Sequence, residues 1–308
     1  MKILVISSNL IGDTILSTGV IEHFSKNNVG AKFTFLIGPT AGQIYEHFPS
    51  LDKIISIKKK RYNLHWFKMY FNCWITTWDI VIDLRSSLLS YLLFTKKRYI
   101  FKKNKTLHHI DQLNQFFNIR KSNLLIHTSN EEKNIVRKKI DNNFHYVVIF
   151  PGGNWKPKIW SVQLYNKLLH LINNKFSNIK FILVGSTYER KLYTKVLKEN
   201  LSNDSFINLM GESLTLTSAF MKKSSLFIGN DSGLMHMSVA SKLSTIGLFG
   251  PTDDKLYGHK ENNCFIIRTK EEYLYFSKNN ENIDSNKSYM FSIKPEQILD
   301  VIIDNNLL

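Results

Sequence analysis

The sequence predicts an α/β protein made of two doubly wound domains, each with a parallel β-sheet and helices on both faces. Short apolar runs alternate with amphipathic stretches along the chain, which is typical of such sheets. The alternation stops in a polar stretch at 121–143 and then starts again. The chain of 308 residues also exceeds one ordinary α/β core and suits two domains of about 150 residues each.

The first predicted domain covers residues 1–143 and opens with an apolar run that predicts a strand. The strands expected here are Lys2–Ile6, 33–37, 53–57, 79–83 and 98–101. Apolar residues at helical spacing predict helices at 14–25, 41–47 and 62–76. A further helix is expected at 131–140, inside the polar stretch.

The second predicted domain covers residues 144–308 and repeats the pattern. Its expected strands are 146–150, 180–184, 206–209, 226–228 and 245–249, and its expected helices are 162–172, 189–197 and 295–303. The last helix can pack on either domain. Ligands of doubly wound sheets bind beyond the carboxyl ends of the strands. The loops at those ends therefore hold the candidate site, in a cleft between the domains.

The loop at 7–13 follows the first strand and leads straight into a helix. It lacks the Gly-x-Gly-x-x-Gly pattern of dinucleotide binding and the Gly-Lys-Ser/Thr ending of a P-loop. A nicotinamide-dependent or ATP-hydrolysing enzyme is therefore disfavoured. Asp13 stands where an acidic residue commonly caps a helix, and the local sequence favours that role.

The loop at 150–160 contains Gly152 and Gly153 directly after a strand, followed by Lys156 and Lys158. Exposed backbone amides beside lysines form a cradle with a cationic clamp, which suits a phosphate. The alternative is a basic surface turn anchored in the core by Trp160. A second turn of the anion-binding type, at 229–236, favours the phosphate interpretation.

That second turn joins a buried strand to a helix that opens near Ser232. The first amides of a helix carry the positive end of its dipole, so this turn can bind an anion. Asp231, Ser232 and His236 place polar groups there, and Gly233 lets a ligand approach the backbone. No second His, Cys or carboxylate lies near His236 at metal-ligand spacing, so no metal site is expected.

Glu189 lies at the end of another strand, in the first turn of the next helix. A carboxylate there interacts favourably with the helix dipole. It also suits the hydroxyls of a ribose. The local sequence does not choose between these two roles.

The charge of the chain is +16, and it is concentrated between residues 53 and 121. This window has 15 Lys or Arg against three acidic residues, a net charge of +12, and it also contains several Trp, Tyr and Phe. Such a mixture suits an anionic membrane surface or a phosphorylated glycolipid, and it can also suit nucleic acid. The alternative is a buried aromatic helix face with solvated lysines.

Cysteine spacing and hydropathy indicate the setting of the protein. Cys73 and Cys264 lie far apart and fit no metal or redox motif, so a reduced cytosolic environment is expected. No segment reaches the roughly 18 uncharged apolar residues of a membrane span. A soluble or peripheral protein is therefore expected.

Several of these segments together resemble glycosyltransferase family nine, the ADP-heptose:lipopolysaccharide heptosyltransferase family. The similarity begins with the opening MKILVISSNLIGDTILSTGVIEHF and continues with Pro-Gly-Gly-Asn-Trp at 151–155, Lys158 and Trp160. It extends through Gly185 with Glu189, Met210-Gly211, the Asn-Asp-Ser-Gly-Leu-Met-His turn at 230–236 and Gly-Pro-Thr at 250–252. The segments occur in the family's order, and they are specific in combination.

The resemblance implies a GT-B architecture, in which two Rossmann-like domains face each other across a cleft. Residues 1–143 would bind the acceptor and residues 144–308 the nucleotide-sugar donor. The match implies that Asp13 is the general base. The donor-binding residues that it implies are Gly152, Gly153, Asn154, Lys158, Glu189, Asp231, Ser232, Gly233, Leu234 and His236. No metal and no cofactor are implied beyond the co-substrate, which is expected to be ADP-heptose.

The implied function is inverting transfer of a heptose to the inner core of lipopolysaccharide or lipooligosaccharide. The partners would be an anionic glycolipid acceptor and the inner leaflet of the cytoplasmic membrane, with the protein cytoplasmic and peripheral and with no nucleic acid. Three alternatives stay open. They are a family member with another sugar donor or glycan acceptor, a sugar-nucleotide epimerase, and a non-catalytic protein that binds nucleotide-sugars or polyanions.

Overall fold

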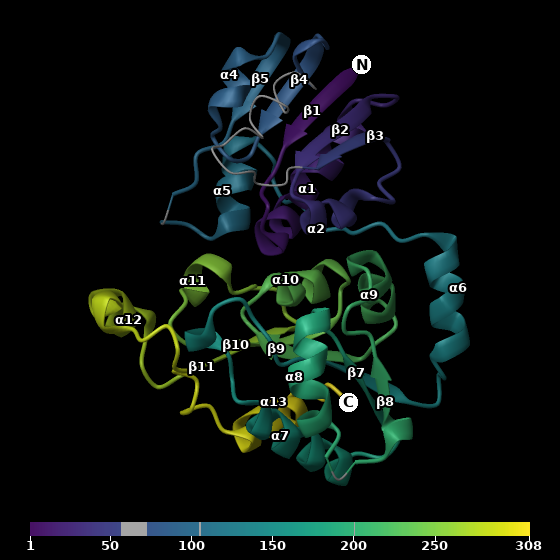
Figure 1. Ribbon diagram of the computed structural model, residues 1–308, viewed down its shortest axis with the longest axis vertical. Helices are drawn as coiled ribbons and strands as arrows, with labels where there is room; N and C mark the ends of the chain where they lie inside the picture. Colours follow the sequence, from purple (N-terminus) through teal and green to yellow (C-terminus); the bar gives the residue numbers. More distant parts are fainter. Residues whose placement is uncertain (57–72, 105, 200) are drawn as a thin grey trace. The chain divides into compact units, whose positions relative to one another are not determined.

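The computed structural model describes residues 1–56, 73–104, 106–199 and 201–308. They form two compact domains, Met1–Ser129 and Asn130–Leu308 (Figure 1). Each domain contains one parallel sheet, which confirms the predicted α/β class. The sequence placed the division between residues 143 and 144. In the structure, helix α6 (Asn130–Lys139) packs against α9 (Leu214–Met221) and is grouped with the second unit.

The first domain has a five-stranded sheet in the order β3-β2-β1-β4-β5. Its strands are β1 (Lys2–Ile6), β2 (Lys32–Ile37), β3 (Leu51–Ser56), β4 (Trp78–Asp83) and β5 (Thr95–Ile100). Its helical segments are α1 (Ile11–Asn27), α2 (Pro39–Gly42), the 3-10 turn η1 (Gln43–Tyr45), α4 (Leu88–Leu92) and α5 (His109–Phe116). The strand order reverses at β1, so the loop after β1 lies at a switch point of the topology.

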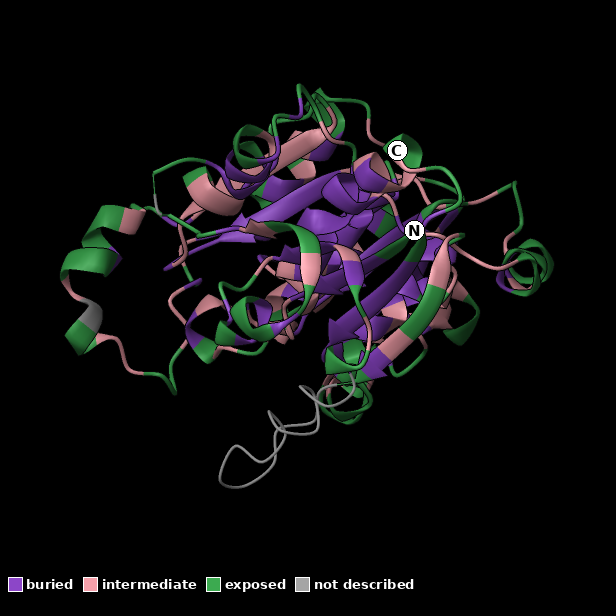
Figure 2. Cartoon of the chain, turned by 90° about the horizontal axis from the view of Figure 1, so that it is seen from above, coloured by how far each residue is buried: buried purple, intermediate pink, exposed green. Residues whose placement is uncertain are grey.

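The strands are buried according to their place in the sheet. The central strand β1 is apolar from Ile3 to Ile6 and almost fully buried, and Figure 2 shows buried strand segments in purple. Strand β5 lies at the edge and exposes Lys96, Lys97 and Arg98. Charged residues on an edge strand oppose unwanted pairing with another sheet. They also explain why the sequence predicted a shorter strand at 98–101.

The second domain has a six-stranded sheet in the order β11-β10-β9-β6-β7-β8. Its strands are β6 (His145–Phe150), β7 (Ile179–Leu183), β8 (Phe206–Asn208), β9 (Leu226–Asn230), β10 (Ser244–Phe249) and β11 (Cys264–Arg268). The order reverses between β6 and β9, which pair in parallel. The loops after these two strands therefore begin side by side. Strand β11 was not predicted, although its Cys-Phe-Ile-Ile run is apolar, and all five of its residues are partly buried.

The second domain also contains helices and short 3-10 turns. In addition to α6 and α9, its helices are α7 (Val162–Lys175), α8 (Thr187–Leu197), α10 (Gly233–Ala240), α11 (Asp254–Tyr257), α12 (Tyr273–Lys278) and α13 (Pro295–Asp304). Its 3-10 turns are η3 (Lys156–Lys158), η4 (Asn203–Ser205) and η5 (Asn280–Asn282). The last helix, α13, packs against α7. Its Ile298 and Ile302 are fully buried in the same core as Trp160. The final helix therefore belongs to the second domain, which decides between the two expected positions.

Both cysteines are free thiols. Burial raises the pKa of Cys73 to about 11 and that of Cys264 to about 12, so both are protonated at neutral pH. Within the described ranges, none of the helices has the length and apolar character needed to cross a membrane. The predicted helix at 62–76 lies largely outside the described residues.

Candidate active site

Asp13 lies in the first turn of α1, just beyond the carboxyl end of β1. The helix begins at Ile11, and its N-cap residue is Leu10, which makes no side-chain capping bond. The expectation from local sequence that Asp13 caps this helix is therefore wrong. The helix begins two residues earlier, so the Asp13 carboxylate is available for other contacts.

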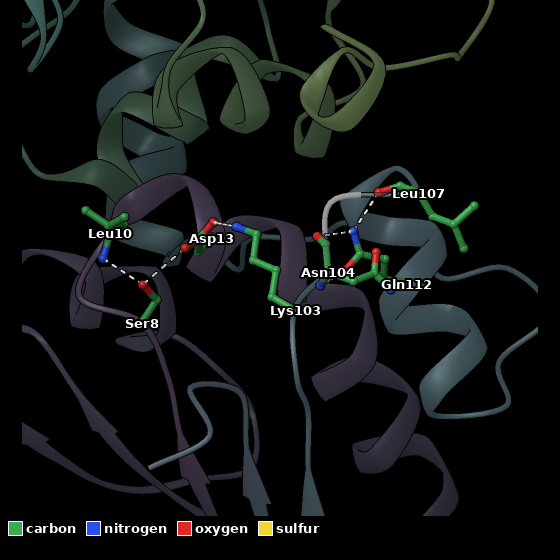
Figure 3. Close-up of polar contacts among 7 residues, drawn as sticks. All are labelled: Ser8, Leu10, Asp13, Lys103, Asn104, Leu107 and Gln112. Atoms are coloured by element: carbon green, nitrogen blue, oxygen red, sulfur yellow. Dashed lines mark hydrogen bonds and ion pairs between the residues drawn. The ribbon is translucent and has the colours of Figure 1, made fainter. Parts of the chain in front are cut away.

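Two side chains contact that carboxylate (Figure 3). The Lys103 Nζ lies 3.2 Å from Asp13 Oδ1, and the Ser8 hydroxyl donates a long 3.5 Å bond to Oδ2. Ser8 Oγ itself accepts from the Leu10 amide at 3.1 Å, which directs the Ser8 proton toward Asp13. The Asp13 side chain remains 27% exposed, so a hydroxyl group from a substrate can reach it.

Asp13 and Lys103 line a small pocket of the first domain. Polar groups of Ser7, Ser8, Ser17 and His109 share this pocket with apolar Leu84, Phe101 and Leu113. The Ser7 hydroxyl is buried and makes no hydrogen bond to any described residue. A carboxylate, a cation and an unpaired hydroxyl thus lie together at the switch point of the first sheet.

His109 is electrically neutral in this pocket at physiological pH. Burial lowers the pKa of His109 to about 4, and the nearby positive charge of Lys103 acts in the same direction, whereas Asp13 opposes it. Its ring therefore adds a polar surface to the pocket without a further positive charge. Lys103 is the cation that faces Asp13 here.

The loop that carries Lys103 is fixed by one buried amide side chain (Figure 3). Gln112 of α5 is 4% exposed. Its Oε1 accepts from the Asn104 amide at 2.9 Å, and its Nε2 donates to the carbonyls of Asn104 and Leu107 at 3.1 and 2.6 Å. Strand β5 ends at Ile100, and the three bonds of Gln112 hold the chain that follows. They position the Lys103 backbone so that its side chain reaches Asp13 in α1.

In the second domain, Asn230 joins the two loops that begin at the switch point. It is fully buried at the end of β9. Its Oδ1 accepts from the Trp160 amide at 3.1 Å, and its Nδ2 donates to the Gly152 carbonyl at 2.8 Å. Trp160 is fully buried and also bonds the Ile293 carbonyl through Nε1 at 3.1 Å. The glycine loop is therefore anchored at both ends to the core.

This anchoring brings Lys158 and Asp231 together. Lys158 Nζ lies 3.4 Å from Asp231 Oδ2, and the two side chains are 14% and 7% exposed. The pair combines two residues that the sequence placed in separate loops. A cation at the end of η3 thus lies beside the turn that opens α10, where an anionic ligand is expected.

Glu189 forms a link between two loops. Its Oε1 accepts from the Gly153 amide at 2.8 Å, and its Oε2 accepts from the Ser186 amide at 2.7 Å and the Ser186 hydroxyl at 2.8 Å. Ser186 in return caps α8, so the two residues form a capping box. Glu189 therefore stabilises the helix start, and it also holds the Gly152–Gly153 backbone in place.

The turn at 231–234 opens α10 as expected. Ser232 is the N-cap residue and makes no side-chain capping bond, and Gly233 is the first helical residue. The hydroxyls of Ser232 and Thr252 are buried and have no hydrogen-bond partner among the described residues. Leu234 is buried, whereas Asn154 of the glycine loop is exposed. The turn thus offers helix amides and the unused Ser232 hydroxyl, while Thr252 lies in the loop after the neighbouring strand β10.

His236 pairs with a histidine that sequence reasoning missed. Its Nδ1 lies 2.9 Å from Nε2 of His259, and both rings are almost fully buried. His259 Nδ1 in turn lies 3.5 Å from the exposed carboxylate of Glu261. His236 is therefore held inside the domain by a polar chain. No group of three His, Cys, Asp or Glu side chains suited to a metal occurs among the residues described.

Comparison with known proteins identifies the family. The family model for glycosyltransferase family 9 (heptosyltransferase) matches residues 85–287. The chain belongs to glycosyltransferase family 9. This family 9 enzyme is 25% identical over 272 residues to lipooligosaccharide heptosyltransferase 2 of Campylobacter jejuni subsp. jejuni serotype O:2, covering 82% of each chain. It is 22% identical over 340 residues to lipopolysaccharide heptosyltransferase 1 of Campylobacter coli, covering 98% of each.

Solved structures share the fold of this family 9 enzyme. A family 9 glycosyl transferase from Veillonella parvula DSM 2008 has a TM-score of 0.79 at 20% identity, with 98% of this chain and 96% of that chain covered. The E. coli heptosyltransferase WaaC with ADP has a TM-score of 0.74 at 15% identity, with 99% and 100% covered. The E. coli ADP-heptose lps heptosyltransferase II has a TM-score of 0.76 at 16% identity, with 100% and 98% covered. The two α/β domains are thus those of the GT-B architecture, and the protein is a glycosyltransferase.

Proposed function

We propose that this glycosyltransferase transfers a heptose from ADP-heptose to an inner-core acceptor of lipopolysaccharide or lipooligosaccharide. The names of its relatives support the sugar and the acceptor class. The observation that carries the proposal is the Asp13 carboxylate, which lies in a pocket beyond the carboxyl end of β1 with a cation and an unpaired hydroxyl. Such groups can bind a sugar by hydrogen bonds, and the carboxylate can remove a proton from one of its hydroxyl groups.

In the proposed reaction, Asp13 is the general base. The acceptor hydroxyl takes a place beside its carboxylate, and Lys103 exchanges Asp13 for an anionic group of the acceptor. The new bond forms between the acceptor oxygen and the anomeric carbon, while the bond from that carbon to the diphosphate breaks. The hydroxyl proton passes to Asp13, and the electron pair of the broken bond leaves with ADP. Attack opposite the leaving group inverts the anomeric centre.

The second domain is proposed to hold the donor. Lys158, the amides that open α10 and the unused Ser232 hydroxyl supply positive charge and donors to the departing diphosphate. We propose that this set serves in place of a divalent cation. Gly152, Gly153 and Asn154 form the loop beside it, and Gly233, Leu234 and His236 shape the helix start. A carboxylate has more lone pairs than Glu189 uses, so a ribose hydroxyl can also donate to it.

The charge distribution supports an anionic acceptor at a membrane. The window from residue 53 to residue 121 has a net charge of +12. Phosphorylated inner-core lipid is polyanionic and lies in the inner leaflet while its core is assembled. We therefore place the enzyme in the cytoplasm, peripheral to that leaflet, with the first domain binding the acceptor. A nucleic-acid partner gives no role to the Asp13 pocket.

The test is a mass-spectrometric assay with purified enzyme, ADP-heptose and a truncated inner-core acceptor. Asp13→Asn should lower turnover by about 10²- to 10⁴-fold, the usual contribution of a general base. Asp79→Asn is a matched control, because Asp79 is 26% exposed and also pairs with a lysine, Lys96, at 2.6 Å. Asp79 lies at the amino end of β4, so its loss should leave turnover unchanged.

Three outcomes are informative. Heptose transfer that is lost only in Asp13→Asn supports the donor, the acceptor class and the base together. Binding of ADP without transfer redirects the proposal to another nucleotide-sugar or glycan. Full turnover in Asp13→Asn refutes the general base.

A further inference from the structure

Helix α4 has an apolar surface on its outer side. Leu88, Tyr91, Leu92 and Phe94 are 81%, 57%, 62% and 62% exposed, whereas Leu89 and Leu93 are each 3% exposed. The four exposed side chains come from the seven-residue segment 88–94. Leu88, Tyr91 and Leu92 have helical spacing within α4, and Phe94 lies in the extended link between α4 and β5. We call them the apolar face of α4.

This exposure is unusual for a helix that packs on a sheet. Such a helix normally directs apolar residues inward and polar residues outward. Here the inward side is already filled by Leu89, Ser90 and Leu93, so the outward residues are not needed for the core. Single exposed apolar residues are common, but adjacent large ones mark a surface that binds something.

Positive charge surrounds the apolar face. Residues 84–110 contain seven Lys or Arg and no acidic residue. Among these, Arg85 precedes α4, and Lys96, Lys97 and Arg98 follow it on the exposed edge of the sheet. Figure 1 shows α4 beside β5 in the first domain. Lys96 is paired with Asp79, and Asp83, which precedes this segment, is fully buried.

The apolar face begins at the carboxyl ends of the strands, where the Asp13 pocket also lies. β4 pairs with β1, and Asp83 lies opposite Ile6 at the carboxyl ends. Asp83 accepts from the amides of Arg85 and Ser87 at 2.8 and 2.7 Å, which fixes the turn into α4. Leu84, in this turn, lines the pocket. A surface that holds the apolar face would therefore hold this pocket near it.

We propose that the apolar face of α4 inserts into the interfacial layer of an anionic lipid bilayer and anchors the first domain there. The proposal deepens, and rests on, the peripheral location given under the proposed function. Leucine and phenylalanine side chains enter the acyl boundary, and the tyrosine places its hydroxyl among the headgroups. The flanking lysines and arginines bind anionic headgroups, and their alkyl stems extend along the boundary.

The charge pattern favours a bilayer over a second copy of the chain. A symmetric dimer through the apolar face would bring two copies of the same basic segment together. Like charges across an interface oppose association. An anionic bilayer satisfies the apolar side chains and the basic ones at once.

Co-sedimentation with vesicles tests the proposal. The vesicles are phosphatidylethanolamine with phosphatidylglycerol as the minority lipid, or phosphatidylcholine alone, with neither donor nor acceptor present. Leu92→Ser with Phe94→Ser should lower the partition coefficient by more than about tenfold, because two apolar side chains no longer leave water. Leu274→Ser with Phe291→Ser is the matched control, since these side chains are 58% and 66% exposed in the second domain. The control should bind vesicles as the wild type does.

A charge variant provides a second measurement that does not depend on the apolar residues. Lys97→Gln with Lys102→Gln should weaken binding to phosphatidylglycerol vesicles by about fivefold for each charge removed. The same variant should leave the weak binding to phosphatidylcholine unchanged. Thermal unfolding confirms that each variant is folded, and the exposed positions should not shift it.

The proposal fails if the wild type does not sediment with anionic vesicles, or if the Leu92 and Phe94 variant binds them equally well. A wild-type dimer that the same variant converts to a monomer, in light scattering without lipid, would assign the face to a second copy and overturn the bilayer. Heptose transfer by the wild type to a truncated soluble acceptor tests the proposed function without a membrane. A wild type that binds anionic vesicles but transfers no heptose to this acceptor would refute the proposed function and leave the membrane anchor intact.

Discussion

The contact between Gly152 and Glu189 gives the sharpest test of how the donor loop is held. A methyl group at Gly152 would lie 1.6 Å from Oε1 and 2.3 Å from Cδ of Glu189. Such distances are impossible, so Gly152→Ala must displace the carboxylate. Glu189 then loses its bond to the Gly153 amide and weakens those to Ser186.

The size of the effect follows from these bonds. A hydrogen bond to a charged group contributes about 1.5–3 kcal/mol. Loss of a helix cap costs about 0.5–2 kcal/mol. Gly152→Ala should therefore lower the free energy of unfolding by about 2–5 kcal/mol. Affinity for ADP should fall as well, because the displaced loop is the proposed diphosphate cradle.

Urea unfolding of a double-mutant cycle measures the effect. In a Glu189→Ala background no carboxylate opposes the new methyl group, so Gly152→Ala should cost less than about 1 kcal/mol, and the coupling should be at least about 1 kcal/mol. Glu189→Gln separates the two roles of the side chain, because glutamine keeps the capping box but turns an amide donor toward the Gly153 amide. Additive costs for Gly152→Ala and Glu189→Ala would refute the link between the loops.

Two further predictions concern ionisable side chains. Lys158→Gln should raise the dissociation constant for ADP, measured by calorimetry, by about 10- to 150-fold. Lys156 is exposed, so Lys156→Gln should change this constant little. Equal effects of the two substitutions would contradict a role of Lys158 in donor binding. The pKa of His109 is about 4 in the folded protein and about 6.5 when unfolded, so the unfolded chain binds the proton more readily. The contribution of neutral His109 to the free energy of unfolding should therefore be fully present above pH 6.5 and be lost as the pH drops toward 4. Over this range the free energy of unfolding of the wild type should fall by about 3 kcal/mol more than that of His109→Asn. Parallel pH profiles of urea unfolding for the two proteins would contradict a buried neutral histidine.

The two sheets and the ends of their strands could be predicted from the sequence. Apolar runs marked the strands, and parallel strands place successive loops at one edge, so loops 150–160 and 229–236 were expected near each other. The Lys158–Asp231 pair confirms that proximity. The reversal of strand order between β6 and β9 supplies the physical reason, because it starts both loops side by side.

Partners that depend on distant packing could not be predicted. Lys103 reaches Asp13 because Gln112 fixes its loop against α5, and no local pattern encodes that contact. The His236–His259 pair likewise joins two segments without a shared motif. The packing of α6 against α9 could not be predicted either, because α6 is charged and mostly exposed and its sequence does not indicate which domain it contacts.

The apolar face of α4 shows a further limit of sequence patterns. The segment Leu-Leu-Ser-Tyr-Leu-Leu-Phe at 88–94 is apolar on all sides, which is equally typical of a buried element. Only the structure separates the buried Leu89 and Leu93 from the exposed residues. Exposure of this kind is a property of the fold and cannot be read from hydropathy.

The two ion pairs of the candidate site have a common logic. Each domain holds one lysine against one aspartate, Lys103 with Asp13 and Lys158 with Asp231. A partly buried lysine stays charged and oriented more easily beside a carboxylate, whose charge offsets the loss of hydration. An anionic substrate can then attract the lysine away from its partner.

On the donor side, the interaction of Lys158 with the departing diphosphate strengthens as charge develops there, which stabilises the transition state more than the ground state. On the acceptor side, the same exchange releases Asp13 to accept a proton, so the base becomes available when an anionic acceptor is bound. Under the proposed function, selection of the acceptor and activation of its hydroxyl thus depend on one contact.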